Sequence, residues 1–354
     1  MKKKKFTYYL QKIVFTLLGI TILASCQFEE LAEDCGEDKG VIILNLGLDG
    51  MSTRATGDTE TTISTVRVFV FAGGVLEVNE LFTSNNTNFS DYIQFEVVTG
   101  DKEIYVVANE NSTLTTVLNS VQSKDALLLI GADVITSVLD FPLVMTGHEN
   151  ATVTVSGITY KTIYLTRVAA KISLQLNKLN ENVGDVKITR VSLFKNSKKS
   201  TLFPTPPATA LSLTADDYMN YTLTLDPIIT LSTTSQETGV FYVYENLGNN
   251  SENKEDFATQ LEIDALYNDI ATNYKDISTK YRVYINEEII SPVTVKPGDP
   301  NSSTIDPNEH LYNIWRNYHY QLTGTISGIG EYTSISVEVK ILPWTVHEYP
   351  VVLE

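Results

Sequence analysis

The side chains best suited to metal binding or nucleophilic catalysis are few and far apart in this chain. Its 354 residues include four histidines and two cysteines. The histidines stand at no spacing that makes a zinc site or pairs one with a nucleophile; they are His148, His310, His319 and His347. A Gly-x-Ser-x-Gly elbow, a His-Glu-x-x-His pair and a phosphate-binding glycine loop are all missing. We therefore expect no catalytic residue, no cofactor and no enzymatic activity.

One loop has part of the oxygen-bearing pattern of a calcium site. Asp299, Asn301 and Ser303 alternate as they do at the start of a calcium-binding loop. Such a loop needs glycine at its sixth position and an acid at its twelfth, but this chain has Thr304 and His310 there. A solvated turn fits the stretch better, and we predict no metal site.

The first 25 residues have the composition of an export signal. A basic head, MKKKKFTYYLQK, precedes the apolar run IVFTLLGITILA. This run is shorter than the roughly 20 residues that span a bilayer, which disfavours the alternative of an uncleaved membrane helix. It ends in Leu23-Ala24-Ser25-Cys26, which resembles the bacterial lipobox, where the cysteine is acylated and becomes the first residue of the mature protein. We predict a lipoprotein signal peptide over 1–25 and a lipid anchor on Cys26.

The mature chain is strongly acidic. The signal holds five of the 26 Lys and Arg and none of the 43 Asp and Glu, so its removal changes the formal net charge from -17 to -22. Such a surface repels nucleic acid and phospholipid headgroups, and we expect no nucleic-acid partner. Residues 26–40 are dense in acids and are predicted to form a solvated tether. With Cys26 acylated, Cys35 has no partner for an intramolecular disulfide, so burial and strand pairing must hold the fold.

From Val41 onward the chain reads as a series of short strands. Apolar and polar residues alternate in runs rich in Val, Ile, Tyr, Phe and Thr, separated by Gly, Asn, Asp and Pro. Helical spacing extends over two short stretches, Thr113–Val121 and Ser123–Ile130, which we interpret as connectors. Since no helix is long enough for a crossover between parallel strands, the pattern favours antiparallel sandwiches and an all-β fold.

The length of the chain favours two globular domains. We place the boundary near Leu165–Arg167, because the following segment reads as a hairpin through the turn Asn180–Asp185, and a hairpin usually stays within one domain. The N-terminal sandwich then covers 36–166, overlapping the end of the tether, and the C-terminal sandwich covers 167–354. A break at the turn itself is the alternative.

A set of motifs along nearly the whole chain resembles the Bacteroidetes fimbrillins, the subunits of the lipoprotein-derived type V pilus. The lipobox is the first of them. The others are TRATGDTETTISTVRVFVF at 53–71, LTRVAAKISL at 165–174, VFYVYENL at 240–247, NYHYQLTGTISGIG at 317–330 and VEVKILPW at 337–344. Their order and spacing carry the resemblance.

The resemblance implies a fold, a location and a mode of assembly. The implied fold is two tandem transthyretin-like (Greek-key) β-sandwich domains. The implied location is the fimbrium, reached by a lipid-anchored, surface-exposed protein of the outer membrane. In the family an arginine-specific protease removes the first strand, and a strand from the C-terminal region of a neighbouring subunit fills the groove. The implied partners are other fimbrial subunits, that protease, and the outer membrane through the lipid on Cys26.

On this chain the removable strand corresponds to 41–48, VIILNLGL. Its large apolar side chains share one face; they are Ile42, Leu44, Leu46 and Leu48. Removing a strand exposes unpaired amides and an apolar slot, and a foreign strand can refill both.

The cut is expected after Arg54, in MSTRAT, so that the trimmed chain starts at Ala55. Small and polar neighbours make this stretch an extended and accessible substrate. The next arginine, Arg67, falls within the strand pattern VRVFVF and is expected to be buried. A plain surface role for Arg54 is the alternative.

The residues after Trp344 carry apolar side chains suited to a donor strand. These side chains are Val346, Tyr349, Val351 and Leu353. Pro350 has no backbone N–H and weakens ladder pairing across the segment. The alternative is that the tail forms an ordinary last strand of its own domain.

We predict a structural subunit of a cell-surface fimbria, a stalk subunit that polymerises by donor-strand exchange and mediates adhesion. The alternative is a non-polymerising surface lipoprotein, or a tip adhesin, that binds glycan or host protein. In that case alternating aromatic residues such as Phe241–Glu245 could line a sugar-binding face.

Overall fold

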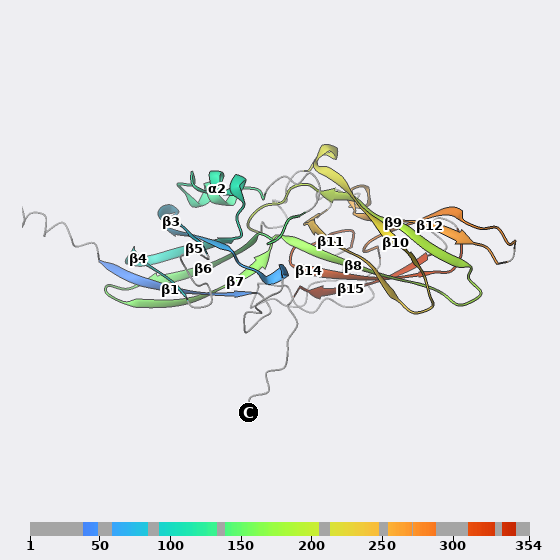
Figure 1. Ribbon diagram of the computed structural model, residues 1–354. Helices are drawn as coiled ribbons and strands as arrows, with labels where there is room; N and C mark the ends of the chain where they lie inside the picture. The colour runs from blue at the N-terminus through green and yellow to red at the C-terminus, as the bar shows by residue number, and fades with distance from the viewer. Residues whose placement is uncertain are drawn as a thin grey trace, which may run out of the picture.

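The computed structural model describes residues 38–48, 59–83, 92–132, 139–204, 213–247, 254–270, 272–287, 311–329 and 335–344. Within these ranges strands dominate and the helical elements are short, which confirms the predicted all-β fold. No helix in the described part of the chain is both long enough and apolar enough to cross a membrane. The molecule is elongated, with the first strands at one end and the later strands at the other (Figure 1).

Residues 39–167 build one seven-stranded sheet, in the order β3-β2-β5-β6-β7-β1-β4. Among the described residues, β6 and β7 pair only where Met145 faces Arg167 and Thr146 faces Thr166. The strands of both flanks contribute to one core, which includes Ile42, Val68 and Phe95. The strands are β1 (Lys39–Leu48), β2 (Thr65–Ala72), β3 (Val75–Thr83), β4 (Ile93–Val98), β5 (Gly100–Ala108), β6 (Met145–Val153) and β7 (Ile158–Arg167).

Residues 169–343 build two four-stranded sheets, β10-β9-β12-β13 and β11-β8-β14-β15. Both sheets bury side chains in a second core, for example Ile172, Val191 and Tyr320, which is the arrangement of a β-sandwich. The strands are β8 (Ala169–Lys178), β9 (Asp185–Ser197), β10 (Tyr218–Thr230), β11 (Gln236–Tyr244), β12 (Gln260–Asn268), β13 (Ile277–Tyr284), β14 (Tyr318–Ile326) and β15 (Ile335–Pro343).

The strands β8 and β9 do not form the predicted hairpin. β8 pairs with β11 and β14, whereas β9 pairs with β10 and β12, so the two strands lie in different sheets. Their connection passes close to the backbone of β12 at Gly184, where a Cβ would clash with the carbonyl oxygen of Asn268. The prediction was wrong because a strand buries alternate residues in the same way whether its successor joins the same sheet or the facing one.

Two strand pairs are parallel, which the expectation of antiparallel sandwiches missed. β1 runs parallel to β7, and β14 runs parallel to β8. The members of each pair are far apart in the chain, so the strands between them make the crossover that a helix makes in an α/β fold. The absence of long helices therefore excludes parallel pairing only for strands that follow one another.

The two predicted connectors are confirmed as short helices between β5 and β6. Helix α2 (Ser112–Leu118) begins after Asn111, and α3 (Lys124–Leu128) begins after Ser123; each preceding side chain accepts a hydrogen bond from a backbone N–H of the first turn. Their buried leucines belong to a cluster that joins both halves of the chain and includes Phe71, Tyr105, Leu202, Tyr244 and Trp344. Single 3-10 turns are η1 (Thr59–Thr61), η3 (Ala215–Asp217) and η5 (Lys254–Phe257).

Candidate functional site: the seat of the first strand

The first strand in the described part of the chain, β1, lies inside a sheet. β1 pairs in parallel with β7 from Val41 opposite Ile158 to Leu48 opposite Leu165. On its other side β1 pairs antiparallel with β4, from Lys39 to Leu44. We call β7, β4 and the turn between β6 and β7 (residues 154–157) the strand seat. β1 thus satisfies the backbone groups of two neighbours, although it is the first described strand of the chain.

The inward face of β1 is part of the core. Ile42 is 0% exposed and Leu44 is 1% exposed, and Leu46 is partly buried against the same cluster. Leu48 ends the strand. The outward residues differ, because Ile43 is half-buried and Asn45 is exposed. The face that the alternation predicts therefore faces the core at Ile42 and Leu44.

β4 depends on β1 for its place in the sheet. In its register Phe95 lies opposite Ile42 and Ile93 opposite Leu44. Ile93, Phe95 and Val97 are buried in the same core. Among the described strands β4 pairs with β1 alone. Loss of β1 would leave β4 without a ladder partner.

The start of β1 is held by the turn between β6 and β7. The backbone N–H of Ser156 donates to the carbonyl oxygen of Lys39 at 2.8 Å, and the N–H of Val41 donates to the carbonyl oxygen of Gly157 at 2.9 Å. Gly40 lies between these bonds. A Cβ there would lie 2.6 Å from the carbonyl oxygen of Thr154. This end of the strand seat therefore fits a residue without a side chain.

The other end of β1 lies beside an aromatic side chain. A Cβ on Gly47 would lie 2.8 Å from Cδ1 of Tyr164, its neighbour in register on β7. Tyr164 is 52% exposed, and it continues an outward row on β7 that includes Ile158 and Tyr160. Sequence reasoning missed both glycines, although a glycine inside a strand is a known signal of close approach by another group.

Glu60 anchors the chain directly after the 49–58 connection. Its carboxylate accepts hydrogen bonds from Lys171 Nζ at 2.6 Å, Tyr242 Oη at 2.5 Å and Trp344 Nε1 at 2.9 Å. Burial alone would raise the pKa of Glu60, but the hydrogen bonds from Lys171, Tyr242 and Trp344 outweigh it and hold the pKa below its ordinary value. Glu60 therefore stays ionised and holds in place the segment that precedes β2.

Arg167, the last residue of β7, joins the same junction. Its Nη1 donates to the carbonyl oxygen of Trp344 at 2.9 Å, and its Nε donates to that of Glu60 at 3.1 Å. Its guanidinium carbon lies 4.5 Å from the centroid of the Trp344 ring, within the range of a cation–π contact. The end of the connection, the end of β7 and the last described residue of the chain thus meet at one point.

Arg67 is buried, as its strand pattern predicts. Its side chain forms an ion pair with Glu110 at 2.7 Å and donates to the side-chain oxygen of Asn79 at 2.7 Å. It is 2% exposed. A protease that reads an exposed arginine therefore cannot use Arg67 in the folded chain.

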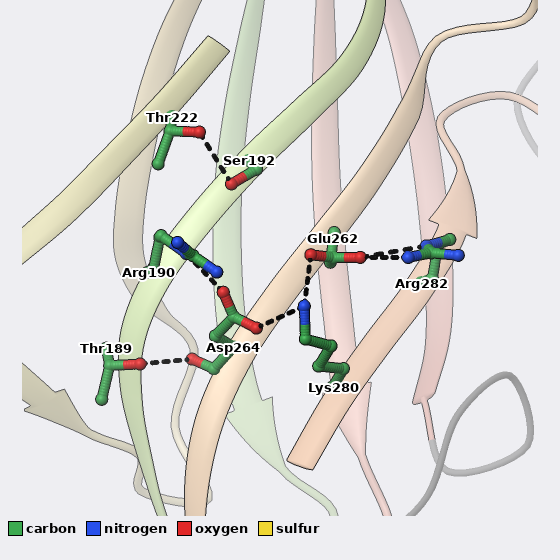
Figure 2. A network of polar contacts seen from close by, with 8 residues as sticks. All are labelled: Thr189, Arg190, Ser192, Thr222, Glu262, Asp264, Lys280 and Arg282. Atoms are coloured by element: carbon green, nitrogen blue, oxygen red, sulfur yellow. Dashed lines mark hydrogen bonds and ion pairs between the residues drawn. The ribbon is translucent and has the colours of Figure 1, made fainter. Parts of the chain in front are cut away.

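A second polar network stabilises the outer face of β9, β12 and β13 (Figure 2). Asp264 pairs with Arg190 at 2.5 Å and with Lys280 at 3.3 Å, and Lys280 also pairs with Glu262 at 3.0 Å. Arg282 forms a further ion pair with Glu262. Burial would raise the pKa of Glu262, but Arg282 and Lys280 outweigh it and lower the pKa. The residues alternate in sign across three strands, which is a structural pattern rather than a catalytic one.

The two described histidines have structural partners. His148 stacks on Tyr105 with ring centroids 5.5 Å apart, and a ring nitrogen of His319 lies 2.8 Å from Ser173 Oγ. No group of three or more His, Cys, Asp or Glu in the described ranges could hold a metal ion.

The aromatic residues considered as a sugar-binding face are not available on the surface. Phe241 and Tyr244 are buried. Tyr242 packs between Phe141 and Trp344, with ring centroids 4.9 Å and 5.6 Å away. This segment serves the junction between the two halves of the chain and offers no stacking platform.

Several predicted site residues lie outside the described residues. They are Cys26, Arg54, Ala55, Val346, Tyr349, Val351 and Leu353, together with His310, His347 and the 298–304 loop. The structure describes the residues that border two of these segments. They are Leu48 and Thr59 on the two sides of the 49–58 connection, and Trp344 before the tail.

Comparison with known proteins identifies the class. Residues 44–190 match the family model described as major fimbrial subunit protein (FimA). The chain is 32% identical to the major fimbrium subunit FimC of Porphyromonas gingivalis over an alignment of 362 positions, which covers 98% of this chain and 73% of that protein. The chain therefore belongs to the fimbrillin family of fimbrial subunits.

Solved structures share the fold. A putative cell adhesion protein from Parabacteroides distasonis aligns with a TM-score of 0.61 at 18% identity, covering 87% of this chain and 99% of that one. A fimbrilin from Porphyromonas gingivalis W83 aligns at 0.57 and 17% identity, covering 88% and 99%. The tip fimbrial protein Mfa3 of Porphyromonas gingivalis, with a C-terminal truncation, aligns at 0.53 and 16% identity, covering 86% and 100%.

Proposed function

We propose that this protein is a stalk subunit of a cell-surface fimbria that polymerises by strand replacement and mediates adhesion. In this proposal a protease cuts after Arg54, β1 leaves the strand seat, and a strand from a neighbouring subunit takes its place. The observation that carries the proposal is the position of β1, which is buried between β7 and β4 although it is the first described strand. Membership of the fimbrillin family supports it.

The energetics of the strand seat favour replacement over an empty groove. Burying a side chain the size of Ile or Leu contributes about 1.5–3 kcal/mol, so Ile42 and Leu44 together contribute about 3–6 kcal/mol. Removing β1 also exposes the amides of β7 and β4 along the strand. An incoming strand restores both the ladder and the apolar contacts.

The junction at Glu60 supports cleavage in the preceding connection. Glu60 is held by side chains from β8, β11 and the residue that follows β15, so the chain after the cut stays in place. Only the 49–58 connection joins this anchored chain to β1. A cut after Arg54 therefore leaves β1 held only by its non-covalent contacts, so that another strand can replace it, and does not loosen β2.

The same junction supports the tail as the donor. Trp344 is fixed by Arg167 and Glu60, and the remaining ten residues follow it. We assign the donor contacts to Val346, Tyr349, Val351 and Leu353, with the pairing interrupted at Pro350. This assignment keeps the fold of the donor subunit intact, because β15 already pairs with β14.

The proposal includes the remaining family features. The two halves are tandem transthyretin-like sandwich domains, 36–166 and 167–354. This boundary is supported by the strands on either side of Val168, because β7 belongs to the seven-stranded sheet and β8 to a four-stranded sheet. The precursor is anchored to the outer membrane by lipid on Cys26, and the trimmed subunit starts at Ala55. Adhesion is the function of the assembled fimbrium.

Substitution of Arg54 tests the proposal. The precursor and its R54K variant are treated with an arginine-specific protease or with trypsin, which also cuts after lysine. We expect the arginine-specific enzyme to release β1 and start polymerisation only in the original precursor, and trypsin to do so in both. Cleaved protein that loses β1 and stays monomeric would contradict the polymer role and favour a tip or non-polymerising adhesin.

A further inference from the structure

The turn between β6 and β7 is the part of the strand seat that contacts the start of β1 through backbone hydrogen bonds. It closes with a hydrogen bond from the N–H of Gly157 to the carbonyl oxygen of Thr154 at 3.0 Å. Ser156 within it has a φ of 51°, a left-handed conformation that a non-glycine residue rarely adopts. Two further backbone bonds join the turn to Lys39 and Val41 of β1. Any strand in this place must fit the backbone of the turn.

The turn leaves no room for a side chain at Gly40. A Cβ there would lie 2.5 Å from Cγ1 of Val153, 2.6 Å from the carbonyl oxygen of Thr154 and 3.1 Å from that of Gly157. The two oxygens belong to the backbone and cannot rotate away. Relief would require a shift of the whole turn and the loss of its bonds to β1.

The contact at Gly47 is of a different kind. The nearest atoms to a Cβ there are Cδ1 and Cε1 of Tyr164, at 2.8 and 3.0 Å. Tyr164 is 52% exposed, so its ring can turn toward solvent. The strand seat therefore has one end closed by backbone and one end covered by a side chain that can move.

We propose that the β6–β7 turn is an end stop that admits no side chain and so sets the register of any strand that replaces β1. The inference rests on the proposed function and names the chemistry of the incoming strand. That strand places apolar side chains at the positions of Ile42, Leu44 and Leu46, and at the position of Gly40 it either has glycine or has already ended. Residues 345–354 contain no glycine, so when they act as the incoming strand none of them occupies the Gly40 position.

Peptide exchange on the nicked protein tests the end stop. The full chain is cut in the 49–58 connection, which leaves β1 bound only by its contacts, and fluorescent peptides then compete with it. The native peptide covers Lys39–Leu48. Two matched variants carry Gly40→Ala or Gly47→Ala, and a shorter peptide starts at Val41. Because overpacking against backbone is costly, we expect Gly40→Ala to weaken binding about 30-fold and Gly47→Ala by less than about threefold.

The outcomes distinguish a failure of the end-stop proposal from a failure of the proposed strand replacement on which it rests. A shorter peptide that binds better than the Gly40→Ala peptide supports the stop, because it lacks the clash. Equal binding of the native and Gly40→Ala peptides would contradict the end-stop proposal but not strand replacement. If the native peptide does not enter, strand replacement itself is contradicted. In the uncut protein, a Tm lowered more by Gly40→Ala than by Gly47→Ala supports the stop, and the reverse order opposes it.

Discussion

Glu60 and Trp344 are 284 residues apart in the chain and are joined by a 2.9 Å hydrogen bond from the indole N–H to the carboxylate. Glu60 is the second described residue after the 49–58 connection, and Trp344 is the last described residue before the tail. Arg167 contacts both. In the proposed assembly, the segment that is cut and the segment that is donated are therefore attached to the same hydrogen-bonded junction.

Loss of the charge on Glu60 is expected to destabilise this junction. Glu60→Gln removes the ion pair with Lys171 and weakens the bonds from Tyr242 and Trp344. Leaving such partners poorly satisfied costs about 1–3 kcal/mol of unfolding free energy. The matched control is Glu237→Gln at an exposed position of β11, which should change stability by less than about 0.5 kcal/mol. Urea denaturation of both variants measures the difference, and equal curves would show that the junction does not contribute.

Acid is expected to weaken the same contacts. The pKa values of Glu60 and Glu262 are both held below the ordinary 4.5. A carboxyl whose folded pKa is lowered stabilises the fold above its unfolded pKa, and that stabilisation is lost as the pH falls through the folded value. Unfolding free energy should therefore decrease as the pH drops below 4.5. The Glu60→Gln variant should show a shallower decrease, and an identical pH profile would contradict the assignment.

Neighbouring isoleucines of β1 offer a matched test of its inward face. Ile42→Ala removes a side chain that is 0% exposed, whereas Ile43→Ala makes the same change at a half-buried outward position. We expect a loss of about 2–5 kcal/mol in the uncut protein for Ile42→Ala and a clearly smaller loss for Ile43→Ala. Thermal or urea unfolding gives both values. A larger loss at Ile43 would mean that β1 sits in a different register.

Release of β1 should free β4 as well. Among the described strands β4 pairs with β1 alone, so its amides lose their ladder when β1 departs. Hydrogen exchange on nicked protein after removal of β1 should show fast exchange over Ile93–Val98, while β12 in the other core keeps its protection. Addition of the Lys39–Leu48 peptide should restore slow exchange. Protection of β4 without any strand in the seat would contradict this dependence.

Local sequence patterns predict the parts of the fold that are decided locally. The alternation in VIILNLGL indicates which side chains face the core, and Ile42 and Leu44 do so. The spacing of leucines around Leu114 and Leu127 indicates the two short helices. The pattern around Arg67 indicates its burial. Whether β1 is removable stays a prediction.

Long-range relationships could not be predicted in this way. The parallel pairing of β1 with β7 depends on strands more than a hundred residues apart, and alternation carries no information about the partner. The bond between Glu60 and Trp344 depends on how the two halves meet. Gly40 and Gly47 are usable signals, since glycine within an apolar strand suggests close approach by another group, but nothing in the sequence names the turn or the tyrosine that approaches them.

The most direct test of the central claim is the N-terminal sequence of subunits isolated from assembled fimbriae. Strand replacement requires that β1 has been removed, so the account predicts that these subunits begin at Ala55 and lack residues 41–48. Assembled subunits that still begin at Cys26 and retain VIILNLGL would contradict it, because the strand seat between β7 and β4 would still be occupied by the subunit's own strand.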